Sequence, residues 1–219
     1  MFPPVSKPVS EVTHVTTVHA LIPQSLLEAI RNLDTPLDDG LAELAAETVT
    51  KRLGLSTTVL AQIERYREAA HAAEPVSLAE AVAVFRLVGR RPDASLVFSD
   101  AGRRAARYAA RSASGVKRGF RRLMPRAMRR RLGVRAAARV ARRIFGVELR
   151  AHQGIHVRLD ESLAVEADVA GDGCYFYSAL FGELLRVTSG FEGAMVHERC
   201  ISRGDQACEW KAAEAERYD

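Results

Sequence analysis

The sequence predicts an α+β fold, in which a helical N-terminal two thirds packs on a small antiparallel sheet with a β-β-β-α-β-β C-terminal part. Three observations lead to this prediction. Apolar residues recur with a helical period over the first two thirds, short β-prone stretches follow in the last third, and no run of 18 apolar residues occurs. The 219 residues, 47% of them hydrophobic, suit one domain with its own core.

The first two thirds of the chain carries helix signals from Pro23 onward. Residues 1–22 are predicted to form an N-terminal arm, and 23–219 a single domain made of a helical extension (23–75) and a core (76–219). Ser77 with Glu80 three residues later forms a capping box. Helices are expected over 23–30, 41–53, 59–73, 77–88 and 99–112, followed by two basic helices divided near Pro125 and Gly133.

The last third changes character. Strands are expected over 145–152, 155–159 and 164–169, then a helix over 174–187, then a hairpin of 193–201 with 206–212. Gly204-Asp205 supplies the hairpin turn, and Ser189-Gly190 ends the helix. Successive strands at short spacing favour antiparallel pairing, which gives the sheet of the predicted α+β plan.

Charge is distributed unevenly. Residues 103–150 contain 17 Lys and Arg and one acid, Glu148, whereas the rest of the chain has 15 basic and 26 acidic residues. One interpretation is a pair of solvated helix faces, and the other is a binding site for an anionic partner. An anionic membrane surface or an acidic protein is preferred as that partner over nucleic acid, because few aromatic residues are interleaved on which bases could stack. The arginines assigned to such a partner are Arg121, Arg122, Arg129, Arg130 and Arg131.

All three cysteines fall near the C-terminus. They are spaced Cys174-x25-Cys200-x7-Cys208, and His197 precedes Cys200 by three residues. Cysteine and histidine are the ligands that zinc prefers, and a hairpin around Gly204 would bring Cys200 and Cys208 across from each other. His197 and Cys200 have opposite strand parity, so a bulge or a strand end near residue 199 is required. The alternatives are three inert buried thiols, or a cross-strand disulfide that a reducing cytoplasm disfavours.

The same stretch resembles a known family. Gly-Asp-Gly-Cys174, the helix Tyr-Ser-Ala-Leu-Phe-Gly-Glu-Leu-Leu, and Val-His-Glu-Arg-Cys200-Ile-Ser-Arg-Gly-Asp-Gln-Ala-Cys208-Glu-Trp resemble the vinyl-reductase domain. That small-molecule-binding module occurs in bacteriochlorophyll 4-vinyl-reductase-like proteins and in aromatic-sensing transcription activators. The resemblance is specific over 171–210 and loose over 80–170. It implies a zinc held by three cysteines and a glutamate whose position is His197 here; Glu198 is one residue out of register.

The resemblance also implies a pocket for a hydrophobic ligand, bounded by the sheet and by the helix that follows Cys174. The alternative for each residue is an ordinary place in the core. The candidate ligand-binding residues are Phe176, Tyr177, Leu180, Phe181, Leu184, Val147, Leu149, Ile155, Val157 and Trp210.

The predicted function is therefore binding of a hydrophobic small molecule, such as a tetrapyrrole or an aromatic hydrocarbon, by a zinc-stabilised carrier or sensor. One alternative is an enzyme or accessory protein in 4-vinyl reduction, although no GxGxxG follows a strand to hold a hydride donor. Another is a docking protein, since the fold is similar to subunits of a vesicle-tethering complex, and this favours a homodimer. A cytoplasmic protein, peripheral to the membrane at most, is expected.

Overall fold

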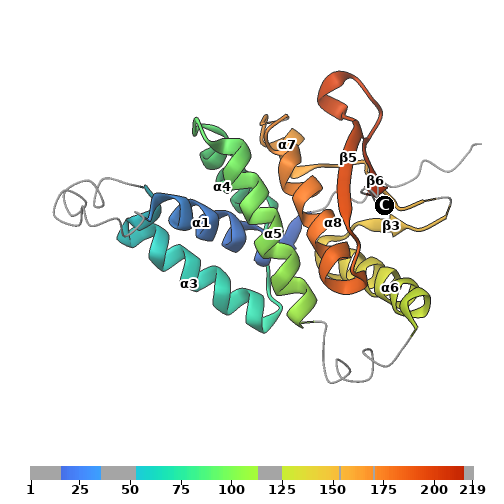
Figure 1. The fold of residues 1–219 in the computed structure, drawn as a ribbon. Helices are drawn as coiled ribbons and strands as arrows, with labels where there is room; N and C mark the ends of the chain where they lie inside the picture. The colour runs from blue at the N-terminus through green and yellow to red at the C-terminus, as the bar shows by residue number, and fades with distance from the viewer. Residues whose placement is uncertain (1–15, 36–52, 113–124, 153, 170, 215–219) are drawn as a thin grey trace, which may run out of the picture.

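The computed structural model describes residues 16–35, 53–112, 125–152, 154–169 and 171–214, and it confirms the α+β prediction. The helices of this part are α1 (Leu21–Asp34), α3 (Thr57–Ala72), α4 (Leu78–Gly89), α5 (Ala94–Ser112), α6 (Arg126–Phe145), α7 (Leu163–Glu166) and α8 (Cys174–Ser189) (Figure 1). The strands are β1 (Thr17–His19), β2 (Pro75–Ser77), β3 (Glu148–Arg150), β4 (His156–Leu159), β5 (Gly193–Arg199) and β6 (Cys208–Glu214).

Local signals place several element ends where the sequence predicts them. The Ser77 hydroxyl accepts the backbone N–H of Glu80 at 3.2 Å at the start of α4, which confirms the N-terminal cap. Gly190 ends α8 with a positive φ of 71°, the left-handed conformation that glycine adopts without strain. The helix expected over 41–53 lies largely outside the described residues.

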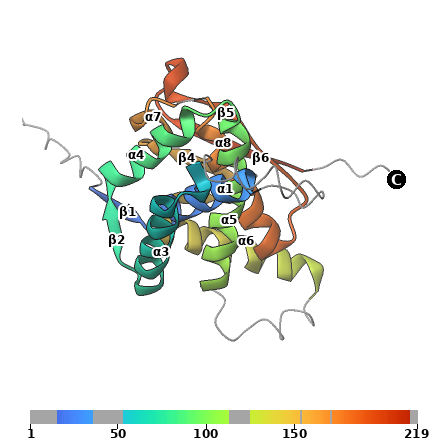
Figure 2. The same cartoon turned by 90° about the vertical axis from the view of Figure 1, so that its left-hand side faces the viewer.

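The C-terminal sheet has four antiparallel strands in the order β3-β4-β6-β5. Trp210 of β6 pairs with Val157 of β4 on one side and with His197 of β5 on the other. A separate two-stranded sheet joins β1 to β2 (Figure 2). Residues 17–22, which were expected in an extended arm, therefore form β1 and begin α1.

Helix α8 lies between α5 and the sheet (Figure 1) and carries the core. Gly102 permits α5 to approach closely, since a Cβ there would lie 2.2 Å from the carbonyl oxygen of Phe176. Aromatic rings then connect the helical layer to the sheet: Phe85 contacts Phe176 at 5.5 Å between ring centroids, and Tyr177 contacts Trp210 at 5.5 Å. The core thus runs without a break from α4 to β6.

Three element predictions differ from the structure. Two basic helices divided at Gly133 were expected, but α6 is continuous through it; this glycine lets α6 pack on the end of α8, because a Cβ would lie 2.4 Å from the carbonyl oxygen of Thr188. The third strand, over 164–169, was wrong. It is replaced by the helical turn α7, in which the consecutive residues Leu163 and Ala164 are both buried, a pattern that strand alternation does not give. Helix α5 begins at Ala94, earlier than expected.

Candidate metal centre

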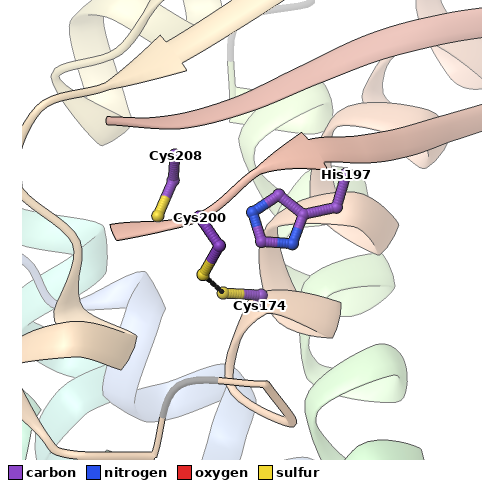
Figure 3. A group of neighbouring side chains, drawn as sticks. All are labelled: Cys174, His197, Cys200 and Cys208. Carbon is purple, nitrogen blue, oxygen red and sulfur yellow. Dashed lines mark hydrogen bonds between the residues drawn. The ribbon is translucent and has the colours of Figure 1, made fainter. Parts of the chain in front are cut away.

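The three cysteines and His197 gather at one end of the sheet (Figure 3). One donor atom from each of Cys174, His197, Cys200 and Cys208 lies within 4.8 Å of the other three. The three thiols are buried, with at most 2% of each residue exposed, and none is in a disulfide. The sequence prediction that these four residues converge is confirmed, and the group they form can hold a metal ion.

The local fold explains the convergence. Cys174 is the first residue of α8, and Cys208 is the first residue of β6. The pairing of β5 with β6 shifts register between His197 and Arg199, and β5 then ends at Arg199. This irregularity turns His197 and Cys200 toward the same point, as their opposite parity required.

The distances between the sulfur atoms distinguish a metal site from a disulfide. The Sγ atoms of Cys174 and Cys200 are 3.9 Å apart, nearly twice the roughly 2.05 Å of an S–S bond. Four ligands at about 2.3 Å around zinc place sulfur atoms about 3.8 Å apart at tetrahedral geometry. The widest donor separation, 4.8 Å, exceeds that edge, so we expect metal binding to draw the four donors together.

His197 shows most clearly that the four residues suit a metal ion. Its Nε2 atom is buried and has no hydrogen-bond partner among the described residues. A buried polar atom without a partner is costly, and metal coordination would satisfy it. The ring is fixed by stacking on Trp210 at 4.5 Å between centroids, with 11° between the planes. The neighbouring Glu198 is exposed, so the histidine takes the fourth place in this cluster.

The protonation states of the four donor residues depend mainly on their burial. Burial raises the pKa of the Cys174 thiol to about 12 and also raises the pKa of Cys208. At Cys200 burial acts in the same direction and is the largest single effect, but hydrogen bonds with Ser202, Cys174 and Cys208 together outweigh it and lower the pKa. Burial lowers the pKa of His197, which favours the neutral imidazole that ligates metals. A metal binding here must displace thiol protons, so its affinity falls as pH falls.

Two further residues support the cluster, and the sequence analysis missed their role. The Asp205 carboxylate accepts the backbone N–H of Cys200 at 2.7 Å, and the Ser202 hydroxyl lies 2.9 Å from the Cys200 Sγ. Both belong to the tight connection from Cys200 to Cys208, which contains a 3₁₀ turn over Ile201–Arg203. An aspartate in a turn commonly bonds nearby backbone, and that was the available signal. Such outer contacts orient metal ligands.

A cleft of about 1110 Å³ lies beside this cluster. Its walls come from β1, the end of α6, strands β4 and β6, and the first turns of α7 and α8. The apolar and aromatic lining residues include Val18, Ile22, Leu78, Ile144, Phe145, Val157, Leu159, Leu163, Tyr177 and Trp210. Trp210 both lines the cleft and stacks on His197, so the two features share a wall.

The candidate ligand-binding residues divide between the cleft and the core. Tyr177, Val157 and Trp210 line the cleft. Ile155 is half-buried and packs against the core. The remaining six do not line the cleft and belong to the core: Phe176, Leu180, Phe181, Leu184, Val147 and Leu149. Val157 and Trp210 are also only 1% exposed, so they meet the cleft with a small part of their surface. Sequence reasoning missed Val18 and Phe145 of the cleft, because nothing local in the sequence shows that segments so distant meet.

The cleft also has a buried polar end. The backbone N–H of Leu163 donates to the Tyr177 phenol oxygen at 3.1 Å, and burial raises the pKa of that phenol. The neighbouring Ser162 is also buried, and its hydroxyl lies beside that phenol. Both residues line the cleft.

The arginines assigned to an anionic partner are only partly described. Arg121 and Arg122 lie outside the described residues. Arg129 is half-buried on α6, whereas Arg130 and Arg131 are exposed. Arg130 forms an ion pair with Glu214 of β6.

Comparison of the chain with protein-family models, with curated proteins and with solved structures gives no match. The resemblance to the vinyl-reductase domain therefore stays a prediction from the cysteine motif. Within the residues that the structure describes, no helix combines the length and apolar character needed to cross a bilayer. The fold and the site define an α+β protein with a Cys₃His group capable of metal binding.

Proposed function

We propose that the protein binds a hydrophobic small molecule in the cleft and that a zinc ion held by the Cys₃His group stabilises the adjoining wall. The observation that carries this proposal is the cleft of about 1110 Å³, whose wall includes Tyr177 and Trp210. Its volume is slightly above the range of about 300–1,000 Å³ that is usual for small-ligand sites. Apolar and aromatic side chains line much of it, and nine charged residues, three arginines and six acids, line much of the rest.

Zinc is the metal that the donor set favours. Three thiolates and an imidazole are soft or borderline ligands, and a tetrahedral sulfur-rich site is typical of zinc. Four protein ligands complete the tetrahedron, which leaves no position for a reacting water. The role of such a metal would be structural: Cys200, directly after β5, and Cys174 of α8 would hold it and so link the two elements, and His197 would be fixed against Trp210.

The ligand class follows from the lining. Aliphatic and aromatic side chains from several elements line the cleft together with charged residues such as Arg143, Arg158 and Glu161. The Ser162 hydroxyl and the Tyr177 phenol provide one polar end. A flat molecule that has apolar faces and also carries polar groups matches this mixed lining, and tetrapyrroles and hydroxylated aromatics are such molecules.

Intrinsic fluorescence tests the proposal directly, because Trp210 is the single tryptophan of the chain and lies in the cleft wall. Titration with protoporphyrin IX, and separately with 2-naphthol, is expected to quench or shift the Trp210 emission saturably. Val18→Arg places a charge in the apolar wall and is expected to weaken binding at least about tenfold. Val187→Arg, at an exposed residue outside the cleft, is the matched control.

Two results would contradict ligand binding in the cleft. If neither probe changes the emission saturably, or if Val18→Arg and Val187→Arg bind equally well, the cleft is not a hydrophobic-ligand site. Mass spectrometry of the native protein then adds an independent measurement, since a co-purifying small molecule would be seen by its mass.

A further inference from the structure

The outward face of α6 is unusual in its charge. Gly133, Ala137, Val140 and Ala141 face the body of the protein and are buried. Five arginines point to solvent, and at 3.6 residues per turn they fall within one broad stripe. These exposed residues are Arg131, Arg135, Arg139, Arg142 and Arg143, and together with Met128 and Leu132 they are called the arginine face below.

The five arginines lack close acidic partners in the described part of the chain. None of them forms an ion pair with a described residue, although the pKa of Glu148 is lowered by Arg150 and, to a smaller extent, by Arg142. By contrast, Arg130 of the same helix pairs with Glu214, and on α5 Arg107 pairs with Glu183 at 2.7 Å. Like charges at this spacing repel one another, so the face gains free energy from an anionic partner.

Two apolar side chains lie within the same face. Met128 is 53% exposed and Leu132 is 37% exposed. Met128 precedes Arg131 by three residues, and Leu132 precedes Arg135 by three, so each shares a side of the helix with its arginine. Cationic and apolar side chains mixed on one exposed helical face suit the boundary between lipid headgroups and acyl chains.

Duplex nucleic acid suits this face less well. Phosphates would pair with the arginines, but exposed Met128 and Leu132 would gain nothing from them. The arginine face also contains no aromatic side chain on which an unpaired base could stack. The combination of charge and apolar exposure therefore favours lipid.

We propose that the arginine face docks the protein on an anionic phospholipid surface. Arg143, Ile144 and Phe145 at the C-terminal end of α6 line the cleft, so docking through α6 brings this edge of the cleft toward the bilayer. A hydrophobic ligand that partitions into lipid would then be within reach. The docking itself rests only on α6 and stands whether or not the cleft binds a ligand.

Vesicle sedimentation tests the docking. The full chain is expected to sediment with vesicles of phosphatidylcholine containing phosphatidylglycerol, and not with phosphatidylcholine alone. Binding is expected to fall by about tenfold or more between about 50 and about 200 mM salt, because screening shortens the reach of the arginine charges. Met128→Ser with Leu132→Ser is expected to weaken binding at every salt concentration, since the apolar contribution is lost.

Matched variants assign the effect to the face. Arg131→Glu, Arg135→Glu and Arg139→Glu together are expected to reduce sedimentation to background. Arg31→Glu, Arg90→Glu and Arg103→Glu change net charge equally at exposed positions on α1, directly after α4 and on α5, and they are expected to retain most of the binding. Circular dichroism melting checks that both triple variants remain folded, and the three Arg→Gln changes at 131, 135 and 139 give a milder second series.

Several results would overturn the docking proposal. They are no sedimentation with anionic vesicles at low salt, equal binding to neutral vesicles, or equal loss in the two triple variants. Binding to a duplex oligonucleotide without binding to anionic vesicles would assign the face to nucleic acid instead.

Discussion

The interface of α5 with α8 and the end of the β5–β6 hairpin are stabilised in different ways. At the first, Ala101, Ala105 and Phe176 are fully buried, and Gly102 lets two helix backbones meet closely. At the second, three buried thiols meet a half-buried imidazole, and the buried His197 Nε2 lacks a hydrogen-bond partner among the described residues. Close packing of side chains stabilises the first region, whereas the second contains donor atoms whose burial is best explained by metal binding.

The stability of the two regions should therefore depend on different kinds of substitution. A change at the helix interface should act through volume and be indifferent to metal. A change at the hairpin end should act through metal binding and be indifferent to small changes of volume. Variants in the two regions are therefore expected to differ in their response to metal.

Cys208→Ser should have the largest effect on stability. Loss of one ligand removes the free energy that metal binding adds to folding, which is about 4 kcal/mol when free zinc stands about 1,000-fold above its dissociation constant. Thermal melting of the native protein should shift down in a strong chelator, while the melting of Cys208→Ser should not shift further. Equal chelator shifts in the two proteins would show that the metal acts elsewhere.

Gly102→Val should destabilise by about 3 kcal/mol, because the new side chain meets the Phe176 carbonyl and the backbone of α8, which cannot move aside cheaply. Added zinc should not restore the loss. Gly182→Ala is the control, since its Cβ would be 3.9 Å from the nearest side-chain atom, that of Met195, and should stabilise α8 by about 1 kcal/mol. Urea unfolding measures both, and an unchanged midpoint for Gly102→Val would refute close packing.

Glu183→Gln should cost about 2 kcal/mol at pH 7, because the buried carboxylate accepts charged hydrogen bonds from Arg186 and, across to α5, from Arg107. Those arginines hold the pKa of Glu183 down to about 2, although burial opposes them. With a lower pKa folded than unfolded, the carboxylate stabilises above about pH 4.3, and this is lost as pH falls toward 2.

Unfolding of the wild type and of Glu183→Gln at a series of pH values checks this sign. The difference between them should shrink steadily from pH 5 downward. A difference that stays constant or grows in acid would show that the carboxylate is not held ionised between the two helices.

Local chemistry made much of the fold predictable. The Ser77 cap, the Gly190 helix end and the turn at Gly204 depend on a few neighbouring residues, and each was found from the sequence. The metal cluster was also predictable, because the spacing from Cys200 to Cys208 implies a hairpin and the parity of His197 implies an irregular strand.

Contacts between distant segments were not predictable. Strand β1 pairs with β2 across more than 50 residues, and no local signal in either strand identifies the other. Gly133 resembles a helix break in sequence, yet it serves close packing against the end of α8. The cleft assembles residues from Val18 to Trp210, so its position depends on tertiary packing.

Elemental analysis of freshly purified, chelator-free protein measures metal binding by the Cys₃His group. We expect about one zinc per chain in the native protein, held by Cys174, His197, Cys200 and Cys208, and little zinc in Cys208→Ser. An absence of metal from the native protein, or the same zinc content in both proteins, would contradict this expectation.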